Sequence, residues 1–325
     1  MDNFVVSYRT FHNSDPPQIL RLWHGSNLGP SAAEGFPCDI LELFIFSQVI
    51  FDRKGFFVAV DDKRVVGFCH AGFAPAPDQS ALDRRHGIIS AMAVHPDYRR
   101  QGVGSHLLQM AERYLAERGS TDVVLGAGLN GNGFYNGIYG GISASGLSLT
   151  AAPWNEFAAR HSYQPHQTVL VMHRDLTIGQ DPVSSRLIRN RRRLNMIITD
   201  RAADMPWWWH VRFGHLDALR FELQERHDQS VVASGEIVGL DVYIPKWGVR
   251  AVGIRDIFVP ENHRRMGYAL SLVVEICKRL REQSVHVIEV QIDKENAAAR
   301  ELFTAAKFEP VQELFSFRKE LNSAT

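Results

Sequence analysis

The sequence predicts an α/β (α+β) protein made of two tandem domains that share one fold. Its 325 residues are enough for two domains of ordinary size. The pattern Arg-Arg-x-Gly-x-(Gly/Ala) occurs at residues 99–104 and again at residues 264–269. Each copy begins five residues after a valine, follows an apolar stretch with strand character, and opens an amphipathic helix. Because strand, turn and helix recur in the same order, we interpret the chain as a duplicated unit.

The amino-terminal half alternates stretches typical of strands and of helices. Its clearest helix begins at residue 103, because Leu107, Ala111 and Leu115 fall on one face. Gly119 then ends the pattern. In order, the expected elements are a strand at 4–10, helices starting at 15 and within 38–50, strands at 56–60, 65–73 and 88–94, the helix from 103, a strand at 121–125, a helix at 155–160 and a closing strand at 169–174.

The carboxy-terminal half repeats the order in a reduced form. Residues 177–193 are polar and rich in arginine, which favours a solvated linker over a nucleic-acid-binding segment. The expected elements are strands at 195–200, 218–224, 231–244, 248–259 and 285–292, one short helix after 205–209, a helix from 268 and a last helix after 296. The predicted domains are therefore residues 1–176 and 194–325, joined by the linker 177–193.

The repeated segment has the features of an anion-binding loop. A glycine turn between a strand and a helix exposes backbone N–H groups at the positive end of the helix dipole, and nearby arginines favour a diphosphate. A dinucleotide fingerprint would need a third glycine where Leu107 stands, and a nucleotide P-loop would need Gly-Lys-(Ser/Thr), which is absent. An ordinary glycine turn is the remaining alternative.

Both segments resemble the acyl-CoA pyrophosphate loop of the Gcn5-related N-acetyltransferase (GNAT) superfamily, whose pattern is (Gln/Arg)-x-x-Gly-x-(Gly/Ala). The resemblance covers nearly the whole chain as two tandem GNAT units. It implies, for each unit, a mixed and largely antiparallel central sheet flanked by helices, with a splayed strand pair that holds acetyl-CoA. It assigns cofactor binding to Met92, Ala93, Val94, Arg99, Arg100, Gln101, Gly102, Val103, Gly104 and Ser105, and to Ile257, Phe258, Val259, Arg264, Arg265, Met266, Gly267, Tyr268 and Ala269.

The amino-terminal domain departs from the family where a catalytic tyrosine is expected. In the family a short tyrosine-bearing helix follows the fifth strand at once. Here a stretch rich in glycine, asparagine and serine, Gly126–Thr150, is inserted, and Ala158 falls at the tyrosine position. In the carboxy-terminal domain Phe303 stands at that position, and the helices that usually form the acceptor wall are curtailed. The amino-terminal domain is therefore the expected enzyme.

The insertion supplies two replacement tyrosines, Tyr135 and Tyr139. Tyr139 is slightly favoured because it follows Asn132 by seven residues, the separation between Asn296 and Phe303. Long loops within compact domains are usually functional or disordered, and aromatic residues among the glycines argue against simple disorder. A flexible surface loop is the alternative.

The resemblance implies an N-acetyltransferase that moves an acetyl group to an amine by direct transfer in a ternary complex. A departing thiolate, whose thiol pKa is about 8.5, can take a proton from a tyrosine. Backbone N–H groups of the strand before the loop can polarise the thioester carbonyl. The base is open between His70, His86 and a water molecule. The alternative function is a non-catalytic regulatory module that binds acyl-CoA.

Bulk composition limits the partners. Lysine plus arginine and aspartate plus glutamate both number 36, so no net field attracts nucleic acid or an anionic membrane. Three widely separated cysteines indicate neither a disulfide framework nor a metal site. The start lacks the basic region of a signal peptide, which favours a cytoplasmic location. The expected acceptor is a small-molecule or peptide amine, and a homodimer is compatible with the sequence.

Overall fold

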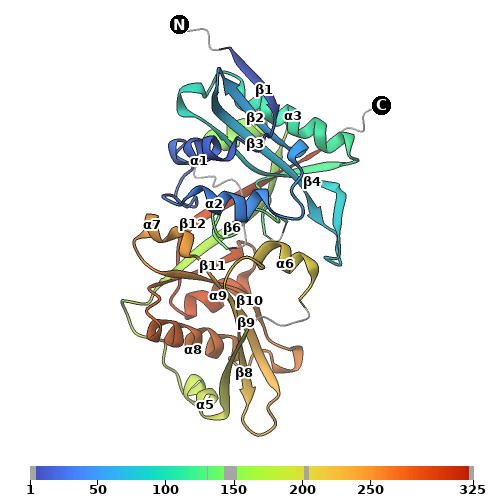
Figure 1. Cartoon of the computed structure of the whole chain (residues 1–325). Helices are drawn as coiled ribbons and strands as arrows, with labels where there is room; N and C mark the ends of the chain where they lie inside the picture. The colour runs from blue at the N-terminus through green and yellow to red at the C-terminus, as the bar shows by residue number, and fades with distance from the viewer. Residues whose placement is uncertain (1–4, 130, 143–151, 201–204, 322–325) are drawn as a thin grey trace. The chain divides into compact units, whose positions relative to one another are not determined.

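The structure, a computed structural model, describes residues 5–129, 131–142, 152–200 and 205–321 (Figure 1). The chain divides into two compact units. The first unit consists of Met1–Thr168, Pro206–His215 and Leu314–Thr325, and the second unit consists of Val169–Met205 and Leu216–Glu313. Each unit is thus assembled from segments that are far apart in the sequence.

The first unit is built on a sheet with the strand order β1-β2-β3-β4-β5-β12. Neighbouring strands are antiparallel except β4 and β5, which are parallel. The strands are β1 (Val6–Thr10), β2 (Phe56–Asp61), β3 (Arg64–Pro75), β4 (Leu82–Val94), β5 (Asp122–Leu125) and β12 (Glu309–Glu320), and the helices are α1 (Pro16–Gly25), α2 (Cys38–Leu41), α3 (Val103–Glu117), α4 (Ala152–Arg160) and α6 (Trp207–Phe213).

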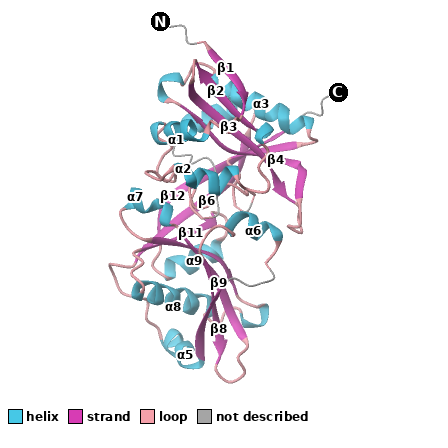
Figure 2. Cartoon of the chain, in the orientation of Figure 1, coloured by secondary structure: helices cyan, strands magenta, loops and turns pink. Residues whose placement is uncertain are grey.

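The second unit has the matching strand order β6-β11-β10-β9-β8-β7, with β10 and β11 parallel (Figure 2). Its strands are β6 (Gln164–Asp175), β7 (Leu194–Asp200), β8 (Ala218–Glu225), β9 (Val231–Gly239), β10 (Ala251–Phe258) and β11 (Val287–Asp293), and its helices are α5 (Ser185–Arg193), α7 (Ile244–Trp247), α8 (Tyr268–Glu282) and α9 (Ala297–Ala305). The mixed, largely antiparallel sheet predicted for each unit is confirmed.

Two predicted segments differ from the structure. The strand expected at 231–244 ends at Gly239, and a short helix follows in which Pro245 occupies the first turn, where its missing N–H costs no hydrogen bond. The expected linker contains helix α5, whose start is capped by Ser184: its hydroxyl accepts a hydrogen bond from the N–H of Leu187. The cap and a packed face stabilise a helix in spite of the run of arginines.

The central strands of each unit part at matching positions. The parallel pairing of β4 with β5 ends at Ile89, and Ser90 is an extra residue in β4 relative to β3. In the second unit the parallel pairing of β10 with β11 ends at Ile254, and the register with β9 shifts after Arg255. A bulge bends its strand and ends the local pairing. Residues 91–94 therefore lie beyond the last residue of β4 that pairs with β5, and their edge on that side is unpaired with it.

The closing strands are exchanged between the two units. Residues 169–174 were expected to close the amino-terminal domain, but residues 169–175 of β6 pair with β11 in the second unit. The edge of β5 is instead paired with Phe317–Glu320 of β12. The two strands alternate in nearly the same pattern of burial, and a period of two specifies the buried face of a strand without specifying its neighbour. For that reason the prediction was wrong.

Helix α6 also belongs to the first unit, although it forms in the sequence of the carboxy-terminal half. Its side chains Trp208 and Trp209 are buried. The buried Arg212 donates a hydrogen bond of 3.3 Å from Nη2 to Oδ1 of Asn136, a residue of the insertion. The helix predicted after residues 205–209 thus packs against the inserted segment.

The exchange of strands predicts that a core substitution in each closing strand destabilises the unit formed mainly by the other half of the sequence. Two residues at matching positions test this. Phe317 is buried in the core of the first unit and Met172 in the core of the second. Phe317→Ala should destabilise by about 3–5 kcal/mol and Met172→Ala by about 2–5 kcal/mol. Hydrogen exchange measured by mass spectrometry should show faster exchange at 122–125 in the first variant and at 287–293 in the second. Faster hydrogen exchange at 287–293 in Phe317→Ala and at 122–125 in Met172→Ala would contradict the proposed exchange of strands.

Candidate functional site

The first repeated loop presents the start of α3 to solvent. Arg100 and Gly102 adopt left-handed backbone conformations, with φ of +62° and +83°. Glycine is needed at the second of these positions, because a side chain there would be strained. The first helical hydrogen bond runs from the N–H of His106 to the carbonyl of Gly102. The N–H groups of the first helical residues therefore have no intrahelical acceptor and can bind an anion.

Side chains of the loop hold its own backbone. The Nε of Arg99 donates to the carbonyl of Val94 at 2.9 Å, and its Nη2 donates to the carbonyl of Ser26. Gln101 donates from Nε2 to the carbonyl of Asp97 at 2.7 Å. Arg100 is exposed. Of the two predicted arginines, Arg99 thus ties the loop to the strand, and Arg100 is directed to the surface.

A cavity of about 1040 Å³ in the first unit joins this loop to the splayed strand. Its lining includes the predicted residues Met92, Ala93, Val94, Arg99, Arg100, Gly102, Gly104, Ser105 and Tyr139. It also includes Asn27, Leu28, Gly29, Pro30, Trp154, Phe157 and Arg160, which the sequence did not reveal. Val103 is buried in the core and Gln101 is exposed, so these two predicted residues lie outside the lining.

The described part of the insertion, residues 126–129 and 131–142, packs inside the first unit. Tyr139 is buried, forms a β-bridge with Ala32 and lines the cavity. Tyr135 is also buried, but its hydroxyl lies 3.0 Å from Nδ1 of His70, outside the cavity lining. The alternative of a flexible surface loop is therefore wrong for these residues, and the two tyrosines have different surroundings. Residues 143–150 of the insertion lie outside the described residues.

Neither histidine considered as a base lines the cavity. Burial lowers the pKa of His70 to about 3, so its ring is neutral near pH 7. His86 lies at the other end of β4, where its Nδ1 is 2.7 Å from a carboxylate oxygen of Asp122. Three candidates for the base were considered: His70, His86 and a water molecule. Since neither histidine lines the cavity, water is the candidate that the position of the cavity favours.

The second loop has the same backbone as the first. Arg265 and Gly267 have φ of +62° and +78°, and Nε of Arg264 donates to the carbonyl of Val259 at 3.3 Å. Met266 is exposed on the loop, and Tyr268 is buried at the start of α8. The same local sequence has therefore produced the same turn twice.

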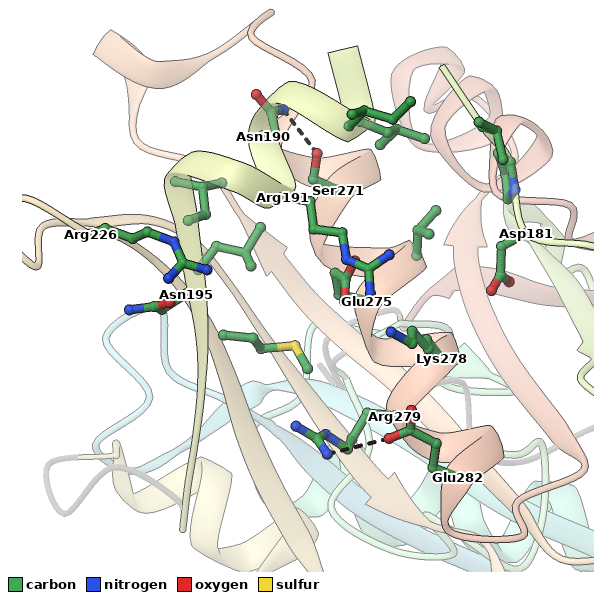
Figure 3. Close-up of a pocket in the computed structure, with 18 residues that line it drawn as sticks. Asp181, Asn190, Arg191, Asn195, Arg226, Ser271, Glu275, Lys278, Arg279 and Glu282 are labelled. Carbon is green, nitrogen blue, oxygen red and sulfur yellow. Dashed lines mark hydrogen bonds and ion pairs between the residues drawn. The ribbon is translucent and has the colours of Figure 1, made fainter. Parts of the chain in front are cut away.

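The surroundings of the two loops differ. A Cβ atom built on Gly102 would have no neighbour within 4 Å among the residues that the structure describes, whereas one built on Gly267 would lie 2.6 Å from Cδ of Arg186 in α5. Asn190 of α5 donates from Nδ2 to the carbonyl of Met266 at 3.3 Å and to the hydroxyl of Ser271 at 2.9 Å (Figure 3). Helix α5 thus covers the second loop.

Among the residues that the structure describes, no group of three or more histidine, cysteine, aspartate or glutamate side chains could hold a metal ion. No helix in the same part of the chain is long and apolar enough to cross a membrane.

Several solved structures share the fold. The glucosamine N-acetyltransferase region of a fungal multi-domain β-N-acetylglucosaminidase has a TM-score of 0.71 at 15% identity, covering 98% of this chain and 38% of that one. A tandem GNAT protein from the clavulanic acid biosynthesis pathway has a TM-score of 0.68 at 14% identity, covering 98% of this chain and 100% of that one. A GCN5-related N-acetyltransferase from Sphaerobacter thermophilus has a TM-score of 0.63 at 14% identity, covering 97% and 95%.

A search of the curated proteins finds no match. The model of the acetyltransferase (GNAT) family, in contrast, matches this sequence twice, at residues 19–136 and 194–308. The two matches include both repeated loops and together span more than half of the chain. The chain belongs to the acetyltransferase (GNAT) family, as two tandem units.

Proposed function

We propose that the first unit is an acetyl-CoA-dependent N-acetyltransferase that transfers the acetyl group directly to a small-molecule or peptide amine in a ternary complex. The observation that carries the proposal is the cavity in which an open anion-binding loop, a splayed strand and a tyrosine meet. The family to which the chain belongs supports acyl transfer. The glucosamine N-acetyltransferase region with the same fold supports an amine acceptor.

The loop and the strand would hold the two ends of the reacting half of acetyl-CoA. The exposed N–H groups at the start of α3, with the helix dipole behind them, suit the diphosphate. Met92, Ala93 and Val94 lie beyond the point where β4 leaves β5, so their backbone can pair with the pantetheine arm. An N–H of this strand can polarise the thioester carbonyl. Acetyl-CoA supplies the activated acyl group.

Of the two tyrosines, Tyr139 suits the role of general acid. Tyr139 lines the same cavity as Met92 and Val94. Tyr135 is engaged with His70, and burial raises the pKa of its phenol well above the usual value. A phenol can protonate a departing thiolate, and the acceptor amine can lose its proton to water.

We propose further that the second unit binds no CoA. Arg186 lies against Gly267, in the place that corresponds to open space at Gly102. Phe303, at the family's tyrosine position, is buried and has no hydroxyl. The second set of predicted residues, from Ile257 to Ala269, would then serve the fold of that unit, and each chain would bind one CoA.

The proposed activity is tested with the purified chain and a panel of amines. Release of thiol from acetyl-CoA that depends on an added amine supports the transferase. Mass spectrometry of the protein as purified reports whether CoA is retained. Tight binding of CoA without thiol release on any amine would favour the non-catalytic regulatory module instead.

The cofactor site predicts opposite outcomes for two matched substitutions. Gly104 and Ala269 occupy the same position after the two loops, and neither has a left-handed backbone. Gly104→Glu places a carboxylate at the open start of α3 and should lower the affinity for CoA at least tenfold, which is about 1.4 kcal/mol. Ala269→Glu should leave the affinity unchanged. Titration calorimetry measures both, and the wild type should bind one CoA per chain; two would contradict the covered second loop.

The assignment of the acid predicts that Tyr139→Phe lowers kcat by roughly 10²–10⁴-fold with little change in CoA affinity. The control is Tyr135→Phe, which removes the hydroxyl that lies 3.0 Å from Nδ1 of the buried His70. That variant should lose about 1–3 kcal/mol of stability and keep most of its kcat. Steady-state kinetics and thermal unfolding separate the two effects. If Tyr139→Phe retains full kcat, another group is the acid.

A further inference from the structure

A second cavity, of about 550 Å³, lies in the second unit between α5, α8 and the strands β7 and β8 (Figure 3). Its lining on α8 runs from Ser271 to Glu282, which is about 16 Å along the helix axis. None of the residues predicted to bind a cofactor in this unit, 257–259 and 264–269, is part of the lining. The cavity is therefore elongated and distinct from the covered loop.

In the first unit the matching place is occupied by two stacked rings. Counting from the two loops, His106 of α3 corresponds to Ser271 of α8, and Tyr8 and Met196 are each the third residue of the edge strand of their unit. The ring centroids of Tyr8 and His106 are 3.9 Å apart. Met196 and Ser271, in contrast, both line the cavity. The cavity is therefore a feature of the second unit that the shared fold does not require.

Much of the lining is apolar and open to solvent. Val183 and Ile188 line the cavity and are 81% and 47% exposed. A ligand that covers such side chains removes apolar surface from water, which favours binding. Helix α5 is held in place by the hydrogen bond of 2.9 Å from Asn190 to Ser271, so this wall is already formed. The apolar lining includes Leu187, Ile188, Leu194, Met196, Leu223 and Val274.

The charged side chains of the lining leave two cations in excess. Arg226 and Lys278 line the cavity and have no carboxylate oxygen within 4 Å in the part of the chain that the structure describes. The carboxylates of the lining, in contrast, are already paired. The pairs are Asp181 with Arg281 at 3.0 Å, Glu275 with Arg191 at 3.5 Å and Glu282 with Arg279 at 3.3 Å. An anionic group on a ligand would therefore find cations that no carboxylate neutralises.

We propose that this cavity binds a medium-chain fatty acid, an unbranched apolar chain that ends in one carboxylate. The chain would lie along the apolar lining beside α8, and Arg226 and Lys278 would hold the carboxylate. Charge-assisted hydrogen bonds from a guanidinium or an ammonium group suit a carboxylate, and burial of the chain contributes in proportion to its apolar area. The site involves neither CoA nor the chemistry of the first unit, so this inference is independent of the proposed function.

The test measures the binding of octanoate, octan-1-ol and acetate to the full chain by titration calorimetry, without CoA and below the concentration at which octanoate self-associates. Octanoate should bind at one site per chain. Octan-1-ol has the chain without the charge and should bind roughly tenfold more weakly. Acetate has the charge without the chain and should show no measurable binding. Equal affinities for octanoate and octan-1-ol, or no binding of octanoate, would overturn the proposal.

Two matched pairs of substitutions locate the carboxylate. Arg226→Gln/Lys278→Gln should lower the affinity for octanoate roughly tenfold, to that of octan-1-ol. Arg113→Gln/Arg189→Gln removes two exposed arginines that do not line the cavity, and Arg113 is the counterpart of Lys278 on α3. This control should bind octanoate as the wild type does. An unchanged affinity in the first pair, or an equal loss in the control, would contradict the assignment of the two cations.

A substitution in the apolar lining locates the chain. Ile188→Asn replaces an exposed apolar side chain and keeps both cations, so it should weaken octanoate and octan-1-ol by the same factor. Circular dichroism checks that each variant is folded. If Ile188→Asn leaves both affinities unchanged, the chain does not lie in this cavity.

Discussion

The left-handed turn at Gly102 is the constraint on which the site of the first unit depends. A helix offers its N–H groups to an anion only where the chain enters it without covering them, and this entry needs a conformation that glycine adopts at little cost. The hydrogen bond from Arg99 to the carbonyl of Val94 joins the turn to the strand before it. The pairing of this strand with β5 ends at Ile89. The turn, the start of the helix and the open edge of the strand are therefore fixed relative to one another.

The second unit contains the same turn, helix start and strand, but its loop is covered. Its turn repeats the backbone angles of the first, and its arginine makes the same hydrogen bond to a valine carbonyl. What differs is the covering of the loop by α5, through Arg186 and the hydrogen bonds of Asn190. Local sequence thus determines the shape of the turn, while a segment that is distant in the sequence determines whether the turn is open or covered.

The predictions succeeded where one segment contains the whole signal. The periods of strands and helices and the glycine turns could be recognised without knowledge of neighbours. The predictions failed where the position of an element depends on another segment of the chain that packs against it. Alternation in β6 and β12 specifies the buried face and leaves the neighbouring strand open, so the exchange could not be predicted. The arginines of α5 suggested a solvated linker. The buried residue of this helix is the polar Asn190, so the sequence shows no buried apolar face that would have indicated packing.

The insertion connects the bulge that opens the sheet to the tyrosine proposed as the acid. Ser90, the extra residue of β4, donates from its hydroxyl to Oδ1 of Asn132 at 2.9 Å. Three residues later the buried Tyr135 bonds to His70 on β3. One helical turn further, the N–H of Tyr139 donates to the carbonyl of Tyr135 at 2.9 Å, and Tyr139 is among the residues that line the cavity. A buried hydroxyl is stable only when it is hydrogen-bonded, so Tyr135 acts as an anchor. The bulge at Ser90 thereby also holds the segment that contains Tyr139, the residue proposed to replace the tyrosine missing at Ala158.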